Sequence, residues 1–219
     1  MLQLFALLAG LSVAASSRPA SPGHPPDPPG GTATVRGAGA QVSTAGQVVR
    51  GERRARLVAS ARRHVGKRFR GDCTGFVRRV YAEAGVPLPS GVRGRSASES
   101  IFRSLAPARV PRRGDLAFFH GTYDREAPGP GRNRFTHVAL VESVEGRRVS
   151  LIHRGNDGIQ RFTMNLARPA DPGENGALRR RRPDDGPRQG YLASELFAGY
   201  GSALVGELRA GRGSRPRHP

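Results

Sequence analysis

A lone cysteine and a small set of histidines have the clearest capacity for chemistry in this sequence. Cys73 is the only cysteine, so it cannot form a disulfide within the chain. It is either a small buried apolar residue or a nucleophile that attacks as the thiolate. Because a thiol with an ordinary pKa of about 8.5 is mostly protonated at neutral pH, the second role requires a neighbouring base.

Histidine is the usual base at neutral pH, and the chain has six. Three of them lie in segments of predicted disorder or at a helix end among arginines, and they are poor partners: His24, His64 and His218. The other three fall on or beside predicted strands. His120 is best explained as a residue at the end of a strand, so His137 and His153 are the predicted partners of Cys73.

Apolar residues recur at helical spacing directly after the cysteine. They are Phe76, Val77, Val80, Tyr81 and Ala84, and Gly85 and Pro87 follow as helix breakers. Cys73 is therefore predicted on the first turn of a helix, where free N–H groups and the helix dipole stabilise a thiolate. Asp72 can cap this turn, although its charge opposes the thiolate.

The two histidines are predicted to share one face of a β-hairpin. Residues two apart in a strand share a face, so a three-residue loop would place His153 opposite Ala139. The two rings would then be diagonal neighbours. A two-residue loop at Glu145 and Gly146 would separate them onto opposite faces. A catalytic pair therefore predicts an odd-numbered loop or a β-bulge in this hairpin.

The predicted elements are helices followed by an antiparallel sheet, which is an α+β plan. Helices are expected over about 52–64 and from Cys73 to Ala84. Strands are expected over 116–120, 136–144, 149–153 and 159–163. Residues 166–190 are predicted to form a basic loop, and 191–208 a C-terminal helix that packs on the domain.

The segments outside this domain predict export and little order. Residues 1–15 resemble a secretory signal peptide, with an apolar stretch that is shorter than the ~20 residues needed to span a bilayer. An uncleaved anchor or a wrongly assigned start is the alternative. The Pro/Gly-rich residues 16–51 are predicted to be a disordered linker, and 209–219 a disordered tail. We therefore expect a secreted or periplasmic protein that is not an integral membrane protein once the signal is removed.

The chain is strongly basic, with a formal net charge of +19, and all but one of its 36 Lys and Arg residues are arginine. The arginines of 50–70 and 179–182 could attract nucleic acid, but no recognition motif accompanies them, so a nucleic-acid partner is not expected. Solvated charge and attraction to anionic envelope polymers both remain as interpretations.

Four sequence blocks, in this order, resemble the NlpC-type and CHAP-type cysteine peptidases. The blocks are residues 72–77, 111–119, 136–142 and 151–153. The resemblance covers roughly residues 53–165 and implies a papain-like catalytic domain over 52–165, with N-terminal helices packed on a small antiparallel sheet. It also implies a cysteine endopeptidase or amidase that cleaves an amide bond in the stem peptides of peptidoglycan.

The resemblance carries roles to individual positions. Cys73 would be the nucleophile, His137 the base, and His153 the polar residue that holds the imidazole, with Asn156 as an alternative to His153. The backbone N–H of Cys73 would be an oxyanion donor. Phe69 stands where the NlpC pattern usually has a tyrosine, so this chain lacks that hydroxyl.

Two alternatives belong to other classes of protein. A catalytically inactive papain-like domain could bind anionic envelope polymers through its arginines. Zinc binding by Cys73 and the histidines lacks the usual paired ligand spacing, and the calcium-like residues 124–126 are followed by a proline. The sequence therefore implies no metal and no cofactor.

Overall fold

The computed structural model describes residues 37–122, 133–183, 185–186 and 189–204. Several predictions from the sequence fall outside these residues. They are the signal peptide at 1–15, the linker up to residue 36, the calcium-like residues 124–126 and the tail at 209–219.

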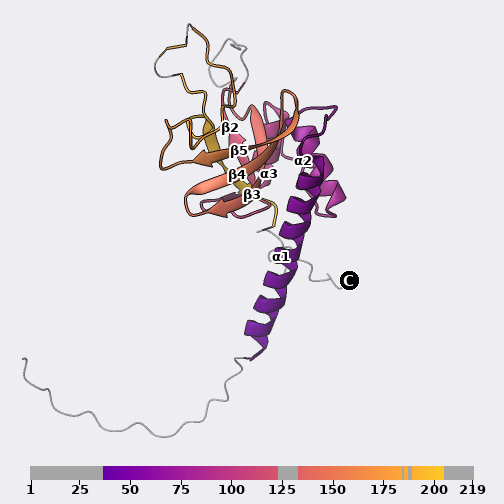
Figure 1. The fold of residues 1–219 in the computed structure, drawn as a ribbon. Helices are drawn as coiled ribbons and strands as arrows, with labels where there is room; N and C mark the ends of the chain where they lie inside the picture. The colour runs from indigo at the N-terminus through magenta and orange to yellow at the C-terminus, as the bar shows by residue number, and fades with distance from the viewer. Residues whose placement is uncertain (1–36, 123–132, 184, 187–188, 205–219) are drawn as a thin grey trace, which may run out of the picture.

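The described chain has three helices and a six-stranded antiparallel sheet (Figure 1). The helices are α1 (Gly37–His64), α2 (Cys73–Glu83) and α3 (Ala97–Ser104). The strands are β1 (Ala106–Ala108), β2 (Leu116–Phe119), β3 (His137–Glu145), β4 (Arg148–Gly155), β5 (Gly158–Asn165) and β6 (Phe197–Ser202). Their order in the sheet is β1-β6-β2-β3-β4-β5. The predicted α+β, papain-like plan is confirmed.

The helices pack on one face of the sheet and form the larger core with it. Leu57 of α1 and Phe76 of α2 lie in one buried cluster with Phe118 and Leu140 of the sheet. Alternation along the strands puts every second side chain on this face. The cluster also contains Cys73, so the first turn of α2 is fixed against the sheet by burial of its apolar neighbours.

The opposite face of the sheet is covered by the segment that follows β5. Ala139, Leu151 and Met164 form a second buried cluster with Ala193, against which Leu178 packs. The predicted basic loop therefore also contributes apolar side chains to a core, which holds it against the sheet.

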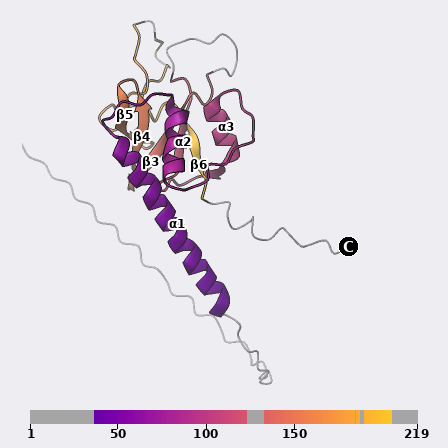
Figure 2. The ribbon, with the colours of Figure 1, turned by 90° about the vertical axis from the view of Figure 1, so that its right-hand side faces the viewer.

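Helix α1 is longer than the sequence predicts. It begins at Gly37, so residues 37–51 are helical and the prediction of a disordered linker up to residue 51 is wrong for this part. Figure 2 shows this half of α1 projecting away from the sheet. Val48 and Val49 are exposed there, so no apolar face marks the helix in the sequence. Once the buried turns nucleate a helix, extension adds a hydrogen bond per residue at little cost.

The predicted C-terminal helix over 191–208 is also wrong, because strand β6 occupies Phe197–Ser202. This strand fills the place between β1 and β2 in the sheet. Gly199 has φ of 153°, and a Cβ at Gly201 would lie 2.8 Å from the Leu105 side chain. Two glycines at alternate positions let the strand approach its neighbours closely, whereas they weaken a helix.

Helix α3 and strand β1 were not predicted. The start of α3 has a capping box, in which the Ser96 hydroxyl accepts a hydrogen bond from the Glu99 backbone N–H at 3.0 Å. A carboxylate oxygen of Glu99 in turn accepts from the Arg95 backbone N–H. The Ser-x-x-Glu spacing was present in the sequence and is the signal that predicts this helix start.

A buried ion pair joins α1 to the start of β2. Arg54 Nη1 donates to Asp115 Oδ1 at 2.7 Å and to the Arg113 carbonyl at 2.9 Å. Gly114 has φ of 81°, and a Cβ there would lie 3.3 Å from the Arg54 Cα. The Gly-Asp pair of the second sequence block therefore allows close approach of the helix and supplies its anchor.

The β3–β4 hairpin has the register that the histidine pair requires. Its loop has two residues, since Glu145 pairs with Arg148, but the register shifts between Val141 and Ser143. Beyond this bulge Leu140 pairs with Ile152, the register expected from a three-residue loop. The prediction of an odd loop or a β-bulge is confirmed, and a bulge is the form it takes.

Candidate active site

Cys73, His137 and His153 line one cleft with a volume of about 540 Å³. The cleft lies between the start of α2, the start of β3, the turn that joins β4 to β5, and residues 176–178. The three residues are separated by up to 80 positions in the sequence and come from different elements. The fold therefore brings together the three residues that the sequence predicts for the site.

Local sequence places Cys73 at the first residue of α2. Asp72 is the N-cap, and its Oδ1 accepts hydrogen bonds from the Gly75 backbone N–H at 2.7 Å and from the Thr74 hydroxyl at 2.8 Å. This is the capping arrangement expected for an Asp before a helix. The cap fixes the turn and leaves the N-terminal end of the helix dipole beside the sulfur.

The environment of the sulfur favours the neutral thiol in the resting state. Cys73 is 4% exposed, and burial raises the pKa of its thiol above the ordinary value. The charge of Asp72 acts in the same direction. A hydrogen bond from the backbone of Val138 and the Ser98 hydroxyl, 3.9 Å from Sγ, stabilise the thiolate in part.

The two histidines form a direct hydrogen bond. His137 Nε2 lies 2.8 Å from His153 Nδ1, and both rings are buried. Burial, followed by the charge of His153, lowers the pKa of His137 to about 3. Burial and then the charge of Arg154 lower the pKa of His153 to about 4. Both imidazoles are therefore neutral at pH 7. The hydrogen bond engages Nε2 of His137 and leaves Nδ1 as its other ring nitrogen.

Two hydrogen bonds and a ring contact hold Phe135, which lies two residues before His137. Phe135 has φ of 50°, which is unusual for a residue other than glycine. His120 Nδ1 accepts a hydrogen bond from the Phe135 backbone N–H at 2.8 Å, and the Ser96 hydroxyl donates to the Phe135 carbonyl. The Phe102 ring stacks on the Phe135 ring at 4.4 Å. His120 therefore supports the entry into β3 and does not line the cleft, as expected for a residue at a strand end.

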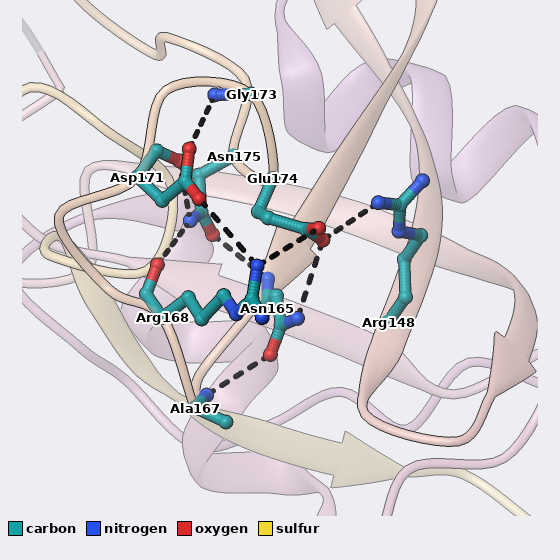
Figure 3. A network of polar contacts seen from close by, with 8 residues as sticks. All are labelled: Arg148, Asn165, Ala167, Arg168, Asp171, Gly173, Glu174 and Asn175. Carbon is teal, nitrogen blue, oxygen red and sulfur yellow. Dashed lines mark hydrogen bonds and ion pairs between the residues drawn. The ribbon is translucent and has the colours of Figure 1, made fainter. Parts of the chain in front are cut away.

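One wall of the cleft is held by a polar network in the segment after β5 (Figure 3). Asn175 is 2% exposed, and its Oδ1 accepts from the Asn165 backbone N–H at 2.8 Å. Its Nδ2 donates to the carbonyls of Arg168 and Asp171. The next residue, Gly176, lies on the cleft, where a Cβ would be 2.7 Å from Phe162. The amide of Asn175 thus fixes the position of this wall.

The structure also places the remaining residues that the sequence singled out. Asn156 lines the cleft, but the ring that contacts His137 is that of His153. Phe69 packs edge-on against Phe76, with ring centroids 5.7 Å apart, and it is not among the lining residues. The catalytic roles of Cys73, His137 and His153 remain predictions that rest on this geometry.

Sequence analysis missed three residues that the structure places at the site. Ser98 beside the sulfur follows from the unrecognised α3, whose capping box was the available signal. Arg154 and Gln160 line the cleft. Gln160 lies directly opposite His153 in the β4–β5 pair, so the predicted strands with their register would have found it. For Arg154 the signal was its place next to His153.

The fold and the site define a papain-like domain with one cysteine and a histidine pair in a single cleft. The NlpC/P60 family model matches residues 61–165 of the chain. This match confirms the resemblance to NlpC-type cysteine peptidases and amidases over this part of the chain. The family match supports a cell-wall peptidase or hydrolase function.

Two further comparisons complete this picture. Among curated proteins, none matches the chain. A solved structure titled "The crystal structure of Ly7917" aligns with 52% of this chain at 18% identity and a TM-score of 0.37. The alignment spans 56% of that protein's chain.

The described residues include neither a cluster of potential metal ligands nor an apolar helix of membrane-spanning length. Within these ranges no group of three or more His, Cys, Asp or Glu side chains is placed to hold a metal ion. None of the described helices has the length and apolar character needed to cross a membrane.

Proposed function

We propose that this protein is an exported cysteine endopeptidase or amidase that cleaves an amide bond in peptidoglycan stem peptides. The observation that carries the proposal is that Cys73, at a helix N-terminus, lines the same cleft as a hydrogen-bonded pair of buried histidines. The NlpC/P60 match supports the class of substrate. Export rests on the signal-like residues 1–15.

The reaction follows from the atoms in the cleft. His137 Nδ1 accepts the thiol proton as Cys73 Sγ attacks the amide carbonyl carbon. The backbone N–H of Cys73 donates to the oxyanion that forms. When the C–N bond breaks, the proton passes from His137 to the leaving amine, and a thioester remains on Cys73. Water then attacks the thioester, with His137 again as the base, and releases the free carboxylic acid.

His153 has a positioning role in this reaction. If His137 Nε2 carries the proton and donates it to His153 Nδ1, the lone pair of His137 stays on Nδ1, where the thiol proton must go. The hydrogen bond also fixes the ring plane. Since both rings are neutral at rest, the thiolate and the imidazolium form together as substrate is attacked.

The proposal is tested with the purified chain and intact peptidoglycan sacculi. The wild-type protein is expected to release soluble peptides, whereas Cys73→Ala and His137→Ala release less than about 1% as much, the loss typical of a missing nucleophile or base. His64→Ala, a histidine outside the cleft, is the matched control and keeps full activity. Equal release by the wild-type and Cys73→Ala proteins would contradict the proposal.

A second function is favoured by the arginines that the structure leaves exposed. Arg180, Arg181 and Arg182 lie at the surface of the segment after β5. We propose, as the alternative, a catalytically inactive domain that binds anionic envelope polymers through such residues. Binding to wall polymers should then weaken steeply from 50 to 500 mM salt and survive Cys73→Ala. Binding that does not respond to salt would contradict this alternative.

A further inference from the structure

The backbone of Phe135 has a conformation that its side chain disfavours. Its φ of 50° lies in the left-handed region, where a bulky residue is a genuine outlier. Such a conformation persists only where the surrounding structure holds it. Phe135 lies directly before the sheet pairing begins, since the Thr136 backbone N–H donates to the Phe119 carbonyl at 2.8 Å. A change in φ at Phe135 would therefore change the direction in which the chain enters β3 and reaches His137.

Two side chains engage both polar groups of the Phe135 backbone. His120 Nδ1 accepts a hydrogen bond from the Phe135 N–H at 2.8 Å, and the Ser96 hydroxyl donates to the Phe135 carbonyl at 2.9 Å. The register of β2 with β3 begins at His137, so Phe135 lies outside the strand ladder and its backbone depends on these side chains. His120 and Ser96 together form a clamp on this residue, the Phe135 clamp.

His120 can act as the acceptor because its ring is neutral. A ring nitrogen accepts a hydrogen bond only when it carries no proton. Partial burial, followed by the charge of Arg134, lowers the pKa of His120 from its ordinary value of 6.5. The His120 ring also packs edge-on against the Phe135 ring, with centroids 4.8 Å apart. His120 thus holds Phe135 through a directional bond and through a ring contact.

The other half of the clamp is joined to the surroundings of the nucleophile. Ser96 is the N-cap of α3, where its hydroxyl oxygen accepts from the Glu99 backbone N–H. Ser98 lies in the same turn, and its hydroxyl oxygen is 3.9 Å from Cys73 Sγ. One turn of α3 therefore contacts the cysteine on one side and the segment that leads to His137 on the other.

We propose that the Phe135 clamp sets the position of His137 relative to Cys73, which makes His120 and Ser96 positioning residues of the site. The inference rests on the proposed function for the role of His137 as the base. Loss of either bond lets Phe135 relax toward a common backbone conformation and moves the imidazole out of place. Because a misplacement of about 1 Å can lower the rate about 100-fold, the loss should reduce kcat and leave KM nearly unchanged.

The test measures the release of peptides by the purified full chain over a range of sacculus concentrations. His120→Leu removes the acceptor and should lower kcat about 100-fold, with KM changed less than about twofold. His120→Asn keeps an oxygen that can accept from the Phe135 N–H, so it should retain most of kcat. His64→Leu is the matched control and should keep full activity. His64 bonds Glu83 at 2.9 Å and packs edge-on against Phe76, but it lies outside the cleft.

A second pair of variants tests the other bond without changing His120. Ser96→Asp can still cap α3 by accepting from the Glu99 N–H, but its carboxylate cannot donate to the Phe135 carbonyl. Ser96→Thr keeps the hydroxyl donor. We therefore expect Ser96→Asp to lower kcat at least about tenfold, while Ser96→Thr retains most of it. Thermal unfolding checks that each variant is folded at the assay temperature.

Folded His120→Leu and Ser96→Asp proteins with the wild-type kcat would overturn the inference, and so would His120→Asn with as little activity as His120→Leu. Failure of the hydrolase would look different, because the wild-type protein would then release no peptides. In that case the clamp is tested on Cys73, the only thiol of the chain, through its rate of alkylation by iodoacetamide. About tenfold slower alkylation of His120→Leu than of the wild-type and His120→Asn proteins supports the clamp, and equal rates overturn it.

Discussion

His137 Nε2 and His153 Nδ1 lie 2.8 Å apart across the β3–β4 hairpin. This contact engages Nε2 of His137 and leaves Nδ1 as its other ring nitrogen. It also depends on strand register, because a shift of one residue would move one of the rings to the other face of the sheet. The hydrogen bond therefore ties the chemistry of the cleft to the geometry of the sheet.

Substitutions of His153 should distinguish its positioning role from the proton transfer by His137. Asparagine can accept a hydrogen bond from His137 through its side-chain oxygen, so we expect His153→Asn to keep a substantial part of kcat. His153→Ala removes the acceptor and should lower kcat about 100-fold, the low end of the contribution of the general base that it holds in place. Release of peptides from sacculi measures both. Equal activity of His153→Ala and the wild-type protein would show that the contact has no role.

Acid should destabilise the fold through the same two rings. Their native pKa values, about 3 for His137 and about 4 for His153, lie below the ordinary 6.5. The unfolded chain therefore binds more protons between pH 6.5 and pH 4, and stability falls as the pH falls through this window. Each ring contributes about 1.4 kcal/mol per pH unit to the slope below pH 6.

Urea unfolding at pH 5.0, 5.5, 6.0 and 6.5 measures this slope. We expect His153→Gln, which cannot titrate, to flatten it by about 1.4 kcal/mol per unit, a difference that the variant's own stability does not affect. His64→Gln is the control, because His64 lies outside the cleft. A slope that is unchanged in His153→Gln would contradict a neutral, buried His153.

We expect the β-bulge at Glu142 to affect both the stability and the activity of the protein. Glu142 is 6% exposed and bonds Arg62 Nε at 2.6 Å and Arg161 Nε at 2.7 Å. These charged partners hold the residue at which the register shifts. Glu142→Ala should lower the free energy of unfolding by about 2 kcal/mol, the cost of losing hydrogen bonds to a charged group.

Because the register sets the histidine contact, kcat of Glu142→Ala should also fall by at least tenfold at a temperature where the protein stays folded. The matched control is Glu145→Ala, an exposed acid at the end of the same strand, which should change neither quantity. Full activity in a destabilised Glu142→Ala protein would mean that the register does not depend on this side chain.

The spacing of apolar residues predicted those helices and strands that bury one face. The helix after Cys73 and the four strands from Leu116 to Thr163 have apolar residues at regular spacing, and the structure contains them all. Parity along 136–153 also predicted that His137 and His153 share a face. These patterns report burial, which explains why the shared face of the two histidines could be predicted.

The parts that were missed follow from other physical causes. Residues 44–49 of α1 are largely exposed, so this part of the helix leaves no apolar pattern in the sequence. Strand β6 owes its place to pairing with β1 and β2. Its partner residues lie 78 to 96 positions earlier, so this pairing cannot be deduced from the spacing within β6. The apolar residues of 191–208 match helical spacing, but glycines at 199 and 201 weaken a helix there. Long-range pairing overrode local pattern there.

The stability of the fold should depend strongly on the buried ion pair between Arg54 and Asp115. Asp115 accepts from Arg54 Nη1 at 2.7 Å and from the Arg112 backbone N–H at 2.9 Å, with side-chain exposures of 10% for Arg54 and 2% for Asp115. Asp115→Asn leaves the Arg54 charge buried without its counter-ion. We expect a loss of about 3–5 kcal/mol in the free energy of unfolding.

The double variant Arg54→Met/Asp115→Leu tests whether this loss comes from the unpaired charge or from the pair itself. Because burying two ions is costly, apolar residues of similar volume should recover most of the stability lost in Asp115→Asn. Urea unfolding of the wild-type, single and double variants gives the comparison. If the double variant were as unstable as Asp115→Asn, the contribution of Arg54 would come from its bonds to the Arg113 carbonyl and Ser202 hydroxyl. Recovery in the double variant would instead show that the stability lost in Asp115→Asn comes from the unpaired charge of Arg54.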